Sequence, residues 1–139
     1  MRLVVCTFLI PALTATVALG HHSLSGVYDG ADQRSLHGAV AEFRFVNPHP
    51  VLVIEVEDDS GARRLWELEM DNRSELARIG VTAETFRPGD TVFVRGGIGL
   101  IRPRTLYLRR LDRPADGLWY EQRGSRPYIG TAAPRSSVN

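Results

Sequence analysis

Three histidines in the first part of the chain have the clearest potential for chemistry. His21 and His22 are adjacent, and His49 stands between two prolines in the segment Asn47-Pro48-His49-Pro50. Imidazole nitrogens are common protein ligands for copper and zinc ions. These residues predict a divalent metal site formed by His21, His22 and His49.

The residues before His21 determine which of its nitrogens could bind a metal. An apolar run over residues 3–19 follows Arg2, and Ala18-Leu19-Gly20 has the small-x-small pattern that signal peptidases accept. A cut after Gly20 would give His21 a free α-amine beside its imidazole, a ligand set that suits Cu(II), then Zn(II) or Ni(II). A cut after Ala18 would place His21 third, where the amine and two deprotonated amides can also bind Cu(II).

We therefore expect residues 1–20 to be a signal peptide and the mature protein to be periplasmic or secreted. A membrane anchor is the alternative, because the apolar run is near the lower length limit for a spanning helix. Pro11 interrupts this run, however, and no basic cluster follows Gly20. We expect no membrane span after cleavage of the signal.

The composition restricts the possible partners and cofactors. The chain has 17 basic and 16 acidic residues, so the loss of Arg2 leaves a balanced charge, which argues against nucleic acid as a partner. Cys6 is the single cysteine and lies within the signal. A mature protein without thiols would bind Cu(II) through nitrogen rather than Cu(I) through sulfur.

The loop around His49 could position a ligand. The prolines push Asn47 and His49 toward extended backbone, and a stiff loop holds a side chain ready to bind. In the alternative interpretation, the loop only makes a turn and His49 bonds to a backbone carbonyl. His37, within a predicted strand, is expected to be a partly buried structural histidine.

Alternating apolar residues predict strands at 36–46, 51–57, 64–70, 91–95 and 105–111. The first changes phase near Ala41-Glu42, which indicates a bulge or bend. A short helix is expected between the third and fourth strands, capped by Asn72 and ended by Gly80. Residues 96–99 are expected to form a glycine-rich loop.

This order of elements predicts a mostly β protein, a small five-stranded OB-like barrel with one short helix between strands 3 and 4. We expect an N-terminal arm over 21–33, the barrel domain over 34–112 and a C-terminal extension over 113–139. Residues 125–139 of the extension are expected to be a loose tail, because they are rich in Gly, Pro, Arg and Ser.

Two functions are compatible with these features, and neither is enzymatic. Alternation places four glutamates on a solvent face near arginines rather than in a catalytic pair, and no nucleophile motif frames Ser23. The first function is copper binding by the three histidines. The alternative is a periplasmic module that binds a protein or ligand through an aromatic barrel face formed by Phe93 and Tyr107, without metal.

Four short motifs in order resemble a family of small exported bacterial proteins of unknown function. They are an HHS start, an LxGxV strand, an NPH loop and an RPGD turn, which begin at His21, Leu36, Asn47 and Arg87 respectively. Leu24 replaces an aromatic, and Pro50 replaces a small residue of the family pattern. The resemblance implies export and a small β domain, and it implies no known activity.

Overall fold

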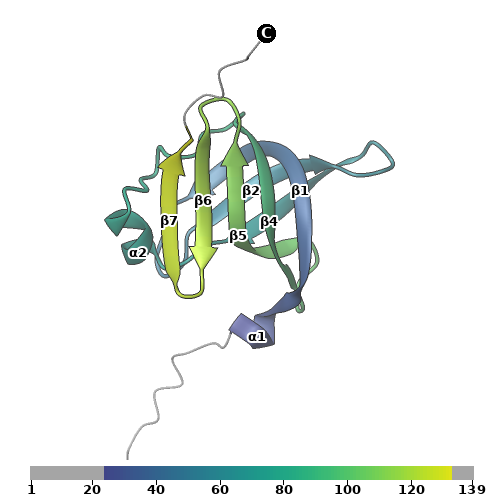
Figure 1. The fold of residues 1–139 in the computed structure, drawn as a ribbon. Coiled ribbons are helices and arrows are strands. Elements are labelled where there is room, and N and C mark those ends of the chain that lie inside the picture. The colour runs from purple at the N-terminus through teal and green to yellow at the C-terminus, as the bar shows by residue number, and fades with distance from the viewer. Residues whose placement is uncertain (1–23, 133–139) are drawn as a thin grey trace, which may run out of the picture.

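The computed structural model describes residues 24–132, which are mostly β-strands (Figure 1). In chain order the elements are α1 (Leu24–Val27), β1 (Tyr28–Arg44), β2 (Val51–Glu57), β3 (Arg63–Glu69), α2 (Arg73–Arg78), β4 (Thr91–Gly99), β5 (Thr105–Arg113), β6 (Leu118–Arg123) and β7 (Arg126–Thr131). The prediction of a mostly β protein with a short helix between the third and fourth strands is confirmed. Neither helix of the described part is long and apolar enough to cross a membrane.

The strands form one sheet in the order β3-β2-β1-β4-β5-β6-β7, with antiparallel neighbours. Strand β3 also pairs in parallel with β5, so the pairings of β1, β2, β3, β5 and β4 make a closed circuit. Strand β1 is long enough to pair with β4 along its first part and with β2 along its last part. The predicted bulge is present, because the β1–β2 register shifts between Val40 and Glu42.

Strand β1 begins earlier, and β4 ends later, than the sequence predicted. Residues 28–33, expected to be part of an arm, pair with the predicted glycine loop 96–99, which is the second half of β4. The close approach of the two strands explains both differences. A Cβ atom on Gly97 would lie 2.4 Å from the backbone oxygen of Asp29, so only glycine fits without displacing β1.

The prediction of five strands is wrong, because the described residues contain seven. The predicted C-terminal extension contains the hairpin of β6 and β7. The first part of the predicted loose tail, up to Thr131, is therefore a strand. Tyr120 explains this order, since it is fully buried and its hydroxyl donates a 2.8 Å hydrogen bond to Gln122. An aromatic ring buried with a satisfied hydroxyl stabilises the hairpin against the rest of the sheet.

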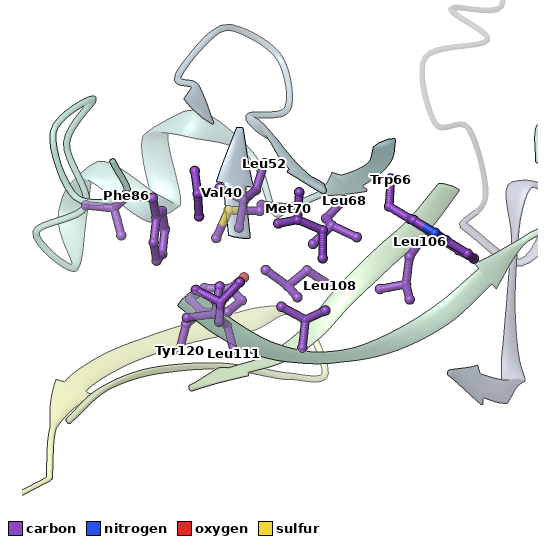
Figure 2. Close-up of a cluster of buried hydrophobic side chains, with 14 of the residues drawn as sticks. Val40, Leu52, Trp66, Leu68, Met70, Phe86, Leu106, Leu108, Leu111 and Tyr120 are labelled. Carbon is purple, nitrogen blue, oxygen red and sulfur yellow. The ribbon is translucent and has the colours of Figure 1, made fainter. Parts of the chain in front are cut away.

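The core lies inside the circuit of strands and continues under the hairpin (Figure 2). All but one of the side chains predicted to point inward are buried, namely Leu52, Ile54, Trp66, Leu68, Met70, Val92 and Val94. The exception is Val56, which is partly buried and packs against this core. Helix α2 closes one end of this core with Leu76, which is fully buried. Its predicted cap is confirmed, because the Asn72 side chain accepts a hydrogen bond from the Glu75 amide.

Candidate functional site

One carboxylate joins the start of β1 to the loop that carries His49. Glu69 is the last residue of β3, and its Oε2 accepts a 2.7 Å hydrogen bond from the hydroxyl of Tyr28, the first residue of β1. Its other oxygen, Oε1, lies 4.0 Å from Nδ1 of His49. The fold thus places His49 and the hydroxyl of Tyr28 beside the same carboxylate.

The His49 loop is held in place by the backbone on both sides. The carbonyl of Pro48 accepts from the amide of Arg73, and the carbonyl of Pro50 accepts from the amide of Met70. The peptide bond between Asn47 and Pro48 is cis. These bonds tie the loop to the connection between β3 and α2, which agrees with the stiffness expected from its prolines.

His49 presents one ring nitrogen to the protein and keeps a partly open side chain. Its Nδ1 is 3.3 Å from the carbonyl oxygen of Met70, and 40% of its side chain is exposed. The predicted bond to a backbone carbonyl is therefore present. In the tautomer that donates from Nδ1, Nε2 carries the free lone pair, and the carbonyl orients the ring as it does for many metal-binding histidines.

Two buried tyrosines form the wall beside Glu69. Tyr28 is 6% exposed and its ring centroid lies 5.7 Å from that of Tyr107. Burial raises the pKa of Tyr107 to about 12 and raises the pKa of Tyr28 further, with help from the hydrogen bond to Glu69. Both phenols are therefore neutral at physiological pH, and Tyr28 acts as a donor.

A second polar connection links the C-terminal hairpin to the residues that follow β3. Gln122 is 6% exposed, and its Nε2 donates a 2.8 Å hydrogen bond to Oδ2 of Asp71. Its Oε1 accepts from Tyr120. Both ends of the amide have partners, so this connection stabilises the fold rather than offering an open ligand position.

The structure does not form the predicted aromatic face. Phe93 is 48% exposed and stacks on His37 with ring centroids 4.4 Å apart, whereas Tyr107 is 4% exposed. The two residues occupy different positions along the β4–β5 ladder, since Phe93 pairs with Asp112 and Tyr107 pairs with Gly97. Tyr28 packs on Tyr107, and His37 is exposed rather than partly buried.

Two of the four glutamates of β2 and β3, Glu55 and Glu67, contact arginines. Glu67 contacts Arg44 at 2.8 Å and Arg102 at 3.0 Å, and Arg44 is the main cause of the lowered pKa of Glu67. Glu55 contacts Arg63 at 3.1 Å. The arginines therefore neutralise the charge of these two carboxylates.

The metal site formed by His21, His22 and His49 stays a prediction, and the structure describes only His49 of the three. His21 and His22 lie outside the described residues, and within residues 24–132 no three His, Cys, Asp or Glu side chains are grouped to hold an ion. Sequence reasoning missed Glu69 as a neighbour of His49 and missed the contact of Tyr28 with Glu69. Alternation along the strand predicts only that the Glu69 side chain points outward. No local sequence pattern indicates its contact with Tyr28, which is 41 positions away.

A family model described as "Family of unknown function (DUF6152)" matches residues 10–99. This span includes His49, Glu69, the start of β1 and the end of β4 that pairs with it, and it ends before β5. The match confirms the resemblance to a family of unknown function. No curated protein and no solved structure matches the chain.

Proposed function

We propose that this chain, which belongs to the family of unknown function DUF6152, is exported and binds a divalent metal ion, copper above all, through His21, His22 and His49. The proposed role is binding and not catalysis. The proposed location is the periplasm or the extracellular space, after removal of residues 1–20. The apolar run and the small residues before His21 support this location.

We further propose that the scaffold is an OB-like barrel extended by a hairpin. The closed circuit of pairings among β1 to β5 and the position of α2 between β3 and β4 support this assignment. Strands β6 and β7 would then be an addition to the end of β5, beyond the residues of β5 that pair with β3. Such a barrel has no need of the disulfides that many small exported domains use.

The contact of Tyr28 and His49 with the same carboxylate carries the metal proposal. Tyr28 binds one oxygen of Glu69, and Nδ1 of His49 is 4.0 Å from the other. Helix α1 connects Tyr28 to Leu24, and the extended chain from His21 to Leu24 can span about 10 Å. The proposal requires that this short connection bring the N-terminal nitrogens to the exposed side of His49.

The available ligands favour Cu(II). Cleavage after Gly20 would supply the α-amine and imidazole of His21, the imidazole of His22, and Nε2 of His49 as an oriented ligand. Nitrogen ligands of this kind bind Cu(II) more tightly than Zn(II) or Ni(II) at equal ligand number. Cleavage after Ala18 would retain Cu(II) binding at the amine, two amides and His21, with less need of His49.

Native mass spectrometry of the protein processed by its own signal, with and without Cu(II), tests this function. We expect a mass that begins at His21 and retains one copper, and we expect His49→Ala to release that copper. His37→Ala is the matched control, because His37 is exposed on β1 and stacks on Phe93 away from the loop. A correctly processed protein that retains no copper, or one whose copper survives His49→Ala, would contradict the proposed site.

A further inference from the structure

A groove lined by arginines crosses β4, β5 and β6, which lie side by side in Figure 1. It has a volume of about 440 Å³, and its polar lining consists of Gln33, Arg95, Arg109, Arg110, Glu121 and Gln122. The groove lies apart from the His49 loop, which contributes no residue to it. Three arginines against one glutamate make its lining positive.

A β-bulge explains why consecutive arginines line the same groove. Arg95 pairs with Arg110, but the next residue, Gly96, pairs with Leu108, so Arg109 is an extra residue in β5. A bulge of this kind interrupts the alternation of side chains and redirects them. Leu108 and Leu111 are both fully buried on the core side, while Arg109 and Arg110 both reach the groove.

Two of the three arginines have no carboxylate partner among the described residues. Arg110 donates to Asp112 at 2.9 Å, whereas Arg109 reaches only the carbonyl of Gly124 at 3.4 Å and the face of Tyr107. The Arg95 side chain makes no hydrogen bond or ion pair within residues 24–132, and only its backbone pairs with neighbouring strands. Like charges directly opposite on neighbouring strands destabilise a sheet, and the Arg95–Arg110 pair is such a case.

An apolar hollow continues the groove toward the start of β1. It has a volume of about 260 Å³, shares Gly30 and Arg109 with the groove, and includes Leu24, Tyr28 and Tyr107 in its lining. Its exposed lining is mainly apolar, and Leu24 is 39% exposed whereas the two tyrosines are buried. A ligand that occupied both hollows would carry a negative group at one end and an apolar group at the other.

We propose that this groove binds a small organic anion, a phosphate or carboxylate joined to an apolar or aromatic group. Arg95 and Arg109 would contact the anion, since a guanidinium matches both groups with paired hydrogen bonds. Leu24 would contact the apolar part, and Tyr107 would hold Arg109 in place, with the Arg109 Cζ 4.8 Å from its ring centroid. This site is independent of the proposed metal site and would function with the metal removed.

Isothermal titration calorimetry of the processed protein in the presence of a metal chelator tests the proposal. The probes are phenyl phosphate, benzoate, inorganic phosphate and benzyl alcohol. We expect one of the two aromatic anions to bind more tightly than inorganic phosphate and the neutral alcohol not to bind. Comparison of phenyl phosphate with benzoate identifies the preferred anion.

Arg95→Gln should weaken binding of the preferred anion about tenfold or more, because it removes charge-assisted hydrogen bonds. Arg126→Gln is the matched control, since Arg126 also makes no ion pair within the described residues and lies outside the groove, on β7. Arg95→Gln should still fold, because the Arg95 side chain is exposed and has no hydrogen bond or ion pair to lose within the described residues. Equal weakening by both variants, or no binding of either aromatic anion, would overturn the proposal.

Discussion

Tyr28 and Glu69 are 41 positions apart, yet the hydroxyl of the first donates a 2.7 Å hydrogen bond to the carboxylate of the second. This bond fixes the first residue of β1 against the last residue of β3, two strands that are not neighbours in the sheet. It also shields Tyr107 from solvent through the packing of the two tyrosine rings. The start of β1 is therefore part of the folded domain and forms one wall of the candidate sites.

Tyr28→Phe should destabilise the protein by about 1–2 kcal/mol, because it removes a hydrogen bond to a charged acceptor while keeping the buried ring. Urea denaturation followed by circular dichroism would measure the change. Tyr128→Phe is the control, since Tyr128 is exposed on β7. Equal stability of Tyr28→Phe and the parent would mean that the bond does not hold the start of β1.

The buried tyrosines should make the protein sensitive to high pH. Burial is the first cause of the raised pKa of Tyr28, Tyr107 and Tyr120, and the value for Tyr107 is about 12 against an ordinary 10.0. A raised pKa in the folded state means that folding favours the neutral phenol. The contribution of these tyrosines to stability is therefore complete below pH 10 and is lost as the pH rises through their pKa values in the folded protein.

The ultraviolet absorbance of tyrosinate, recorded during an alkaline titration, would test this dependence. We expect the three buried tyrosines to ionise late and together with unfolding, as reported by circular dichroism. Tyr28→Phe should reduce the amplitude of this late step. Ionisation of all tyrosines near pH 10 without loss of structure would refute the prediction.

Local patterns predicted the middle of the fold well. Strands β2 and β3, the bulge after Val40 and the Asn72 cap each depend on neighbours within a few residues, and the structure contains them. Local patterns failed, in contrast, for the glycine-rich second half of β4. Without side chains they show no alternation, so residues 96–99 were predicted as a loop, although the same lack of side chains lets β1 approach.

The site residues were harder to predict because their contacts are distant in sequence. The loop at His49 was predicted from its prolines, and its bonds to Met70 and Arg73 agree with that prediction. The contact of Tyr28 with Glu69 and the bulge that directs Arg109 into a groove depend on strand pairing. The aromatic face of Phe93 and Tyr107 is predicted from alternation alone. Alternation does not show that Tyr28 of β1 covers Tyr107.

Gly97→Ala should disrupt the pairing of β1 with β4. Its Cβ atom would lie 2.4 Å from the backbone oxygen of Asp29, and backbone cannot move aside as a flexible side chain can. We expect a loss of about 1–3 kcal/mol, as in other overpacked sites, and faster amide exchange in residues 28–33. Gly30→Ala is the matched control, since nothing lies within 4 Å of its Cβ position.

Hydrogen exchange measured by mass spectrometry would locate the change caused by Gly97→Ala. The protection of backbone amides from exchange should fall at the start of β1 and stay unchanged in β2 and β3. A uniform loss of protection, or equal effects of the two alanine variants, would contradict a local role for Gly97. Metal and anion binding measured on the same variant would show whether both proposed sites require the start of β1.

Asp58 should make the β2–β3 hairpin sensitive to acid. The Ser60 hydroxyl is the main cause that lowers the pKa of Asp58 to about 2, and the amides of Ala62 and Ser60 and the Arg64 guanidinium add to it. A lowered pKa in the folded state favours the carboxylate, so the contribution is present above the ordinary 3.8 and is lost as the pH falls through the folded value.

Nuclear magnetic resonance of the Asp58 carboxyl carbon during an acid titration would measure that pKa directly. Asp58→Ala should lower stability at neutral pH and remove this part of the acid dependence, because the turn loses the acceptor for two of its amides. Asp59→Ala, one position away in the same turn, is the control and should leave the hairpin intact. A normal titration of Asp58, or equal destabilisation by both variants, would show that the carboxylate does not hold the turn.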